Sequence, residues 1–151
     1  MHEERDFWLV DERLVIWRPA GLLDADRVTA YLDFLERVER EHRGARLRLN
    51  DFSLVTEVDV DYAAVSDAAR RRRESRERSG ETIRVAFFAP TALAFGLSRM
   101  YQQLAASASF EIEVFDAIED ATGWLGVDAR VLTSTPPPRA RRSGEKGDAP
   151  R

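Results

Sequence analysis

The hydrophobic pattern between residues 83 and 106 predicts a buried strand followed directly by a helix. The run from Val85 to Ala89 is entirely apolar and too short for a buried helix, which is typical of a strand covered on both faces. Pro90 ends this strand, and Thr91 is placed to cap a helix. The helix is expected to bury the large apolar residues that recur at spacings of four, three and four: Leu93, Leu97, Met100 and Leu104. Such a strand–helix pair is half of a βαβ unit.

Upstream, the pattern predicts a hairpin, a helix and a strand. Residues 7–10 and 14–17 are short apolar runs around a polar loop, as in a β-hairpin that Pro19 and Gly21 end. Asp24 is a suitable N-cap for a helix that ends near Gly44. Residues 45–50 alternate and indicate a strand. The predicted helix has apolar residues at helical spacing: Val28, Tyr31, Leu32, Leu35 and Val38.

The middle of the chain is less regular. Residues 51–61 show no clear period and are predicted to form a connecting loop with a short strand-like piece. An alanine-rich helix follows from Asp61 and stops at Gly80. Its second half contains six arginines between residues 70 and 78 and no apolar stripe, so this half is expected to project beyond the core into water.

The C-terminal pattern predicts one more strand, one more helix and a tail. Residues 110–115 alternate strictly, as in a half-exposed strand. The last helix has capping-box spacing from Asp116 to Glu119 and ends at Gly126. The expected fold class is therefore α/β, with a mixed, mostly parallel sheet, an N-terminal β-hairpin and four helices. We expect residues 1–127 to form this domain and residues 128–151 to form a disordered tail rich in proline and arginine.

The charge distribution argues against a dedicated nucleic-acid binder. The net charge is -4, but residues 128–151 carry +3, so residues 1–127 carry -7. Specific nucleic-acid binding relies on neutralising phosphates, which an acidic body does not do. The arginine run and the tail could contact an acidic protein, a membrane surface or RNA, but a solvated helix end and a solubilising extension are the favoured interpretations.

The same composition indicates a soluble, cytoplasmic protein. The chain has no cysteine and no apolar run of membrane-spanning length, and its charged N-terminus does not look like a signal peptide. His2 and His42, the two histidines, lack the neighbours that a metal site or a catalytic triad requires. There is no glycine-rich phosphate loop. We therefore predict no metal, no cofactor and no enzymatic activity.

Two features have both a structural and a functional interpretation. Gly96 inside a helix is explained by close packing on the sheet, or by the approach of a ligand to the backbone. The acidic residues between 51 and 61 are a solvated connection, or a binding loop at the end of a parallel strand.

Phe95 and Tyr101 fall outside the predicted stripe of their helix, which suggests an exposed apolar face and self-association.

The order of elements, with residues 51–61 before the second helix, resembles the STAS-like (SpoIIAA-like) fold of anti-sigma-factor antagonists. The segments VAFFAPTALAFGLSRMYQQLA and VFDAIEDATGWLG are similar to those of bacterial STAS/SEC14-type proteins of unknown function. The resemblance covers roughly residues 7–127 and implies the fold more than an activity.

The antagonists have a loop of the approximate form Asp-Leu-Ser-Gly-Val-Thr-x-Ile-Asp-Ser-Ser-Gly, whose second adjacent serine is phosphorylated. Five residues here match it: Asp51, Ser53, Val55, Thr56 and Asp59. The serine pair is replaced by Val60 and Asp61, and the glycine by Tyr62. The resemblance therefore implies that the phosphorylation switch is lost in its usual form, with Asp61 as a permanent negative charge.

Two hypotheses follow. The first is a non-enzymatic, homodimeric protein-interaction module whose partner loop contains Asp51, Ser53, Thr56, Asp59 and Asp61. The alternative is a SEC14-like binder of a small apolar or lipid ligand. The residues expected at its ligand site, or at a dimer face, are Phe95, Arg99, Tyr101 and Trp124. The sequence does not identify the partner, the ligand or the pathway.

Overall fold

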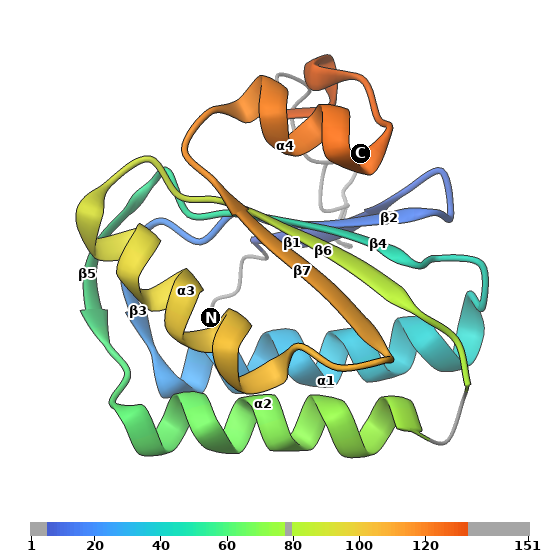
Figure 1. Ribbon diagram of the computed structural model, residues 1–151, viewed down its shortest axis with the longest axis horizontal. Coiled ribbons are helices and arrows are strands. Elements are labelled where there is room, and N and C mark those ends of the chain that lie inside the picture. Colours follow the sequence, from blue (N-terminus) through green and yellow to red (C-terminus); the bar gives the residue numbers. More distant parts are fainter. Residues whose placement is uncertain (1–5, 78–79, 133–151) are drawn as a thin grey trace, which may run out of the picture.

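The computed structural model describes residues 6–77 and 80–132 (Figure 1). Its strands are β1 (Phe7–Val10), β2 (Leu14–Trp17), β3 (Gly21–Asp24), β4 (Leu47–Asp51), β5 (Val55–Asp59), β6 (Ile83–Phe88) and β7 (Phe110–Phe115). Its helices are α1 (Ala25–Glu41), α2 (Tyr62–Glu77), α3 (Ala92–Ala105) and α4 (Ile118–Leu125), followed by the short 3₁₀ helix η1 (Ala129–Leu132). The predicted order is confirmed, with β3 added and the strand-like piece of residues 51–61 formed as β5.

The main sheet has the strand order β1-β2-β4-β6-β7. β1 and β2 are antiparallel, and all other neighbours in this sheet are parallel. The hairpin turns at Asp11 and Glu12, whose positive φ angles of 53° and 56° are those of a type I′ turn. The predicted α/β class, with a mostly parallel sheet and an N-terminal hairpin, is confirmed. β3 and β5 form a separate parallel ribbon.

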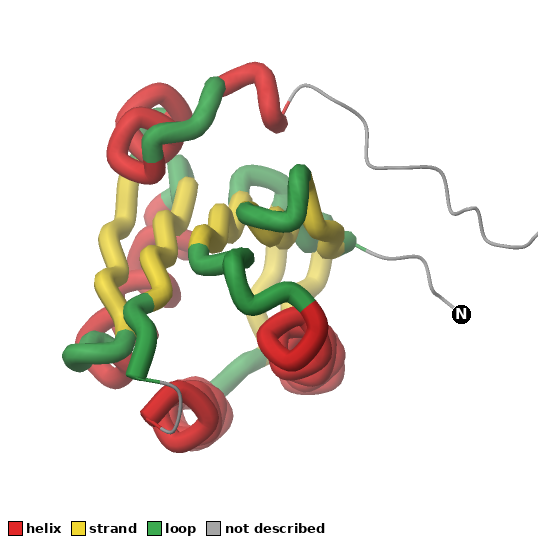
Figure 2. Tube along the Cα trace, turned by 90° about the vertical axis from the view of Figure 1, so that its right-hand side faces the viewer, coloured by secondary structure: helices red, strands yellow, loops and turns green. Residues whose placement is uncertain are grey.

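Helices cover the main sheet on both faces (Figures 1 and 2). We call the face under α1, α2 and α3 the three-helix face, and the face under α4 the single-helix face. β2 shows the division, because Val15 and Trp17 join the larger apolar cluster of the three-helix face, whereas Leu14 and Ile16 join the smaller cluster around α4. The alternation of side chains along a strand therefore supplies both cores.

Local signals account for three of the helix ends. Asp24 caps α1 by accepting a hydrogen bond from the Arg27 amide (3.0 Å), and Thr91 caps α3 in the same way for Ala94 (3.1 Å). Gly126 ends α4 with φ +76°, which glycine adopts easily. The predicted capping box at Asp116 is wrong, because α4 is preceded by Ala117 and has no side-chain cap.

The predicted buried stripe of α3 is only partly correct. Leu97 and Leu104 pack against the core, but Leu93 is exposed. The fully buried residues of this helix are the small ones, Ala94, Ser98 and Ala105. Small side chains let a helix approach the sheet closely, and they carry little weight in a pattern of large apolar residues.

The prediction for α2 is wrong in its second half. The helix does not project into water there, because Arg72 and Arg76 are buried. Its buried face continues in register from Val65 through Ala68 and Ala69 to these two arginines. The close packing proposed for Gly96 is also wrong, since a Cβ added there would meet no atom within 4 Å.

The chain remains ordered through η1, whose Val131 and Leu132 pack on the cluster of the single-helix face. The Arg18 side chain donates a hydrogen bond to the Leu132 carbonyl oxygen (2.5 Å). The predicted tail spans residues 128–151, and its part after Leu132 lies outside the described residues.

Candidate functional site

A cavity of about 70 Å³ lies between the three-helix face and the helices that cover it. Most of its wall is apolar and comes from β2, β6 and all three helices; Trp17, Leu35, Ala68, Phe87 and Tyr101 are examples. The aromatic rings form a chain along this wall, from Tyr31 stacked on Trp17 (4.1 Å between centroids) to Tyr101 against Phe87 (5.8 Å). The interior therefore has space for a small apolar group.

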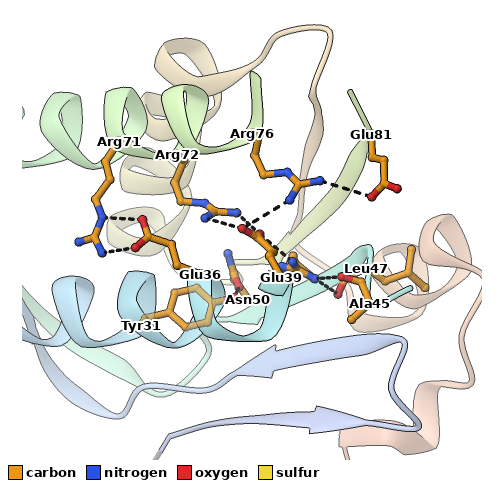
Figure 3. Close-up of polar contacts among 11 residues, drawn as sticks. Tyr31, Glu36, Glu39, Ala45, Leu47, Asn50, Arg71, Arg72, Arg76 and Glu81 are labelled. Carbon is orange, nitrogen blue, oxygen red and sulfur yellow. Dashed lines mark hydrogen bonds and ion pairs between the residues drawn. The ribbon is translucent and has the colours of Figure 1, made fainter. Parts of the chain in front are cut away.

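The central strand β4 turns its polar side toward this cavity. Leu47 and Leu49 pack on the single-helix face, so Arg48 and Asn50 face α1 and α2. Both polar residues are buried. The alternating sequence of β4 thus has its polar half inside the protein, because helices cover both faces of the sheet. Asn50 accepts a hydrogen bond from the Tyr31 hydroxyl (2.8 Å; Figure 3).

An ion cluster borders the cavity. The Glu39 carboxylate of α1 pairs with Arg48 of β4 (3.0 Å) and with Arg72 of α2, and both arginine side chains are only 2% exposed. Arg76 lies 3.5 Å from Glu39 and 3.8 Å from Glu81. Figure 3 shows the guanidinium groups of Arg72 and Arg76 directed at the Glu39 carboxylate. Two deeply buried cations, Arg48 and Arg72, therefore share a single carboxylate.

The electrostatics follow from this geometry. Burial opposes ionisation of Glu39, but the hydrogen bond from Arg72 and the charges of Arg72 and Arg48 outweigh it and lower the pKa of the carboxyl. Burial lowers the pKa of Arg48. Burial also raises the pKa values of the Tyr31 and Tyr101 phenols, which lie close enough to Arg72 to interact with its charge. At neutral pH the cluster is an ionised one.

Three buried donors beside the cavity have no hydrogen-bond partner among the described residues: the indole Nε1 of Trp17, the Nε of Arg48 and the hydroxyl of Ser98. Trp17 is 4% exposed, and the other two residues are 1% exposed. A larger, open groove of about 360 Å³ between β1 and α1 contains none of these atoms. An unpaired buried polar group costs about 1–3 kcal/mol and requires an explanation.

A second feature lies at the end of the molecule formed by β3, β5 and the first turns of α2 and α3 (left in Figure 1). Five large apolar side chains are exposed there, between 37% and 62%: Leu22, Leu54, Tyr62, Leu93 and Phe95. We call this set the apolar end. Glu57, Asp59 and Asp61 are exposed on the same elements and give its edge a negative charge. Exposed apolar groups gathered in one region are typical of interaction surfaces.

The structure separates the residues predicted for the partner loop. Thr56 and Asp59 are exposed on β5, and Asp61 is exposed at the start of α2, where it accepts a hydrogen bond from the Ala64 amide (2.9 Å). Asp51 is buried instead, paired with Arg18 (3.2 Å) and accepting from the Ser53 amide (2.9 Å). Asp51 therefore stabilises the loop through buried contacts and does not belong to its exposed surface.

The residues predicted for a ligand or dimer face do not form one site. Phe95 and Arg99 are exposed on α3, whereas the Tyr101 ring points into the cavity of the three-helix face. Trp124 lies across the sheet, where the Arg84 guanidinium stacks on its ring (4.0 Å) and Phe115 packs beside it. A single pocket containing both Tyr101 and Trp124 is therefore excluded.

The sequence interpretation missed Arg48, Arg72 and Glu39. Their signal was present, because the buried face of α2 continues onto position 72 at helical spacing, and Glu39 follows the buried Val38 of α1. A charged residue that continues the apolar face of a helix is expected to be buried only with a partner. When a neighbouring helix has a residue of opposite charge on its own apolar face, the two indicate a buried ion pair.

Among residues 6–77 and 80–132, no group of three or more His, Cys, Asp or Glu side chains is arranged to hold a metal ion. No helix of that part of the chain is long and apolar enough to cross a membrane.

Comparison with known proteins identifies the fold. No known family matches this sequence, and no curated protein matches it. The structure of the anti-sigma factor antagonist SpoIIAA in its unphosphorylated form matches with a TM-score of 0.54 at 14% identity, over 80% of this chain and 96% of that chain. An uncharacterized protein of the DUF3478 family with a SpoIIAA-like fold, from Shewanella loihica PV-4, matches with a TM-score of 0.46 at 17% identity, over 79% and 90%. The match to SpoIIAA shows that the protein has a SpoIIAA-like, or STAS-like, fold.

Proposed function

We propose that the protein is a non-enzymatic, cytoplasmic interaction module, and that the apolar end is its partner surface. The observation that carries this proposal is the gathering of Leu22, Leu54, Tyr62, Leu93 and Phe95 at one end of the fold. The fold supports it at the coarse level, because a SpoIIAA-like fold is in general a protein-binding one. The acidic edge adds a preference for a partner with basic residues around an apolar centre.

The module works without a phosphorylation switch at the start of α2. The sequence resemblance aligns Val60 and Asp61 with the serine pair of the antagonists, and the Asp61 carboxylate accepts a hydrogen bond from the Ala64 amide in the first turn of α2. A permanent carboxylate there supplies a constant negative charge, with fewer acceptor oxygens than a phosphate. In this proposal the module is not switched by phosphorylation at this position.

A photo-cross-linking residue placed at position 95 tests the surface, with the same residue at position 103 as the control. Phe95 belongs to the apolar end, whereas Gln103 is exposed elsewhere on α3. The expected result is a partner captured from position 95 alone. Its binding to the purified protein should then be weakened by Leu93→Ser with Phe95→Ser and left unchanged by Gln103→Ser. Equal binding to all variants would remove the apolar end from the proposal.

A companion pair of variants tests the acidic edge. Asp59→Ala removes an exposed charge of the proposed surface, and Glu113→Ala removes an exposed charge of β7, at the far edge of the main sheet. Only Asp59→Ala should weaken partner binding and reduce its dependence on salt. We also propose that the module is a homodimer. Light scattering at micromolar concentration tests this, and a monomer would contradict it.

The cavity favours a second candidate function, the binding of a small ligand in the manner of a SEC14-like protein. Its support is the apolar space under α2 and α3, together with the unpaired donors of Trp17 and Ser98. Native mass spectrometry of the purified protein should then show a bound small molecule or lipid. A mass equal to the bare chain would count against a ligand that copurifies.

A further inference from the structure

We propose that the cavity of the three-helix face binds a small amphipathic carboxylate, with its apolar body in the cavity and its anionic group beside Arg48 and Arg72. The inference rests on the second candidate function and specifies the chemistry of its ligand. It depends on three features of the wall: its shape, its unpaired donors and its charge.

The donors decide which kind of polar group fits. Trp17 Nε1 and Arg48 Nε can only donate a hydrogen bond, and the Ser98 hydroxyl can donate one. Tyr101 lines the same space. A group that pairs with any of these donors must therefore be a hydrogen-bond acceptor. A carboxylate has two oxygens and about four acceptor positions, whereas an ammonium group has none.

The charge points the same way. Arg48, Arg72 and Arg76 carry three positive charges against the two negative charges of Glu39 and Glu81, which leaves an excess of one. A buried charge that is not compensated is costly, since the interior screens it poorly. A bound monoanion would neutralise this excess. Its hydrogen bonds to charged donors would also be stronger than those of a neutral ligand.

The size and polarity of the space argue for an amphipathic ligand in place of water alone. A cavity of about 70 Å³ has room for about five to seven water-sized groups, counting 10–15 Å³ for each. Most of the wall is apolar, with Leu35 and Phe87 as examples, and offers no hydrogen bond to water. A short acid with four to six carbon atoms beyond its carboxyl, or an aromatic acid of similar size, would fill the apolar part and place its oxygens at the donors.

The test compares two acids with their neutral amides, which have the same number of non-hydrogen atoms. The probes are pentanoate with pentanamide and benzoate with benzamide, at millimolar concentration. Binding is followed by the indole N–H signals of the three tryptophans in two-dimensional NMR, assigned from Trp8→Phe and Trp124→Phe. The Trp17 signal should shift with either or both acids, and Trp124, across the sheet, should not. The amide should bind about tenfold more weakly, because it lacks the charge.

Two variants locate the ligand. Ala64→Leu adds three carbon atoms to the cavity wall, and Ala63→Leu adds them to an exposed neighbour on the same helix. Only Ala64→Leu should weaken acid binding, by more than about tenfold, since it occupies the space. Ser98→Ala removes an unpaired donor, so it should raise the melting temperature of the free protein while weakening acid binding severalfold. If Ser98 had only a structural role, its replacement would not raise the melting temperature and weaken acid binding at the same time.

Each outcome has one meaning. If neither acids nor amides move the Trp17 signal, this inference fails, and native mass spectrometry decides separately whether the second candidate function stands. If the amides bind as tightly as the acids, ligand binding stands and the anionic head group is wrong. If the acids bind equally well to the Ala64→Leu variant, they bind at the surface, which also overturns the inference. The proposed partner surface at the apolar end is independent of all three results.

Discussion

The two faces of the main sheet have the same strands but opposite chemistry. Under α4, the single-helix face is closed by apolar side chains such as Ile16, Leu49 and Leu125, and its charged group Arg84 stays at the rim, paired with Glu111. Under α1–α3, the three-helix face encloses ions, unpaired donors and a cavity. Natural folds keep such costly features where a function repays them, so the difference indicates which face does more than stabilise the fold.

The largest effect is expected from Glu39→Gln, which leaves Arg48 and Arg72 buried without their carboxylate. Breaking a buried ion pair by removing one partner costs about 3–5 kcal/mol. Glu36→Gln is the matched control one turn earlier on α1, because it removes a more exposed pair with Arg71 worth about 0–1 kcal/mol. Urea unfolding of both variants measures the difference. Equal losses would show that the buried cluster is no different from a surface pair.

Leu125→Ala tests the opposite face. Leu125 is buried between α4 and the sheet, so its truncation should lower the free energy of unfolding by about 2–5 kcal/mol. The change should leave the NMR signal of Trp17 and its response to pentanoate unchanged, because the sheet separates the two clusters. If Leu125→Ala alters pentanoate binding, the faces are coupled and the division between them is weaker than the contacts indicate.

The charges of the three-helix face also explain why the sequence predicted the fold better than the site. The buried strand at β6 and the apolar face of α1 were found because large apolar residues repeat with a clear period. Arg72 and Arg76 of α2 also follow the helical period, but the absence of an apolar stripe in this half of the helix predicts a solvated end. Only Glu39, which lies 33 residues earlier and opposite in space, shows that Arg72 is buried.

The sequence of β4 did not predict that Arg48 and Asn50 are buried, for a related reason. Its alternation of leucine with arginine and asparagine is compatible with one wet face and one dry face. Four helices cover both faces here, so the polar half is inside. For α3, the small residues that pack on the sheet have less weight in a hydrophobic pattern than the exposed Leu93 and Phe95. In both elements, the packing of helices on the sheet determines which residues are buried, and the hydrophobic pattern of a single element does not.

Acid should weaken the three-helix face selectively. The pKa of Glu39 is lower in the folded protein than its ordinary value of 4.5, so the stabilisation is fully present above pH 4.5 and is lost as pH falls through the folded-state pKa. The melting temperatures of the native protein and of Glu39→Gln should therefore converge in acid. Leu125→Ala should keep a constant difference from the native protein over the same range. A gap between native and Glu39→Gln that does not change with pH would contradict the ionised cluster.

The smallest effect concerns Gly96, at the apolar end and outside both cores. A Cβ at this position meets no atom within 4 Å, so Gly96→Ala should stabilise α3 by about 1 kcal/mol through helix propensity alone. Gln103→Ala on the same exposed helix changes propensity little and serves as the control. The glycine is therefore unexplained by folding, and the apolar end around Phe95 supplies a reason: a partner that approaches the helix backbone closely. In that case Gly96→Ala raises the melting temperature yet weakens binding of the partner captured from position 95. Unchanged binding in a stabilised variant would show that the helix is approached through its side chains only.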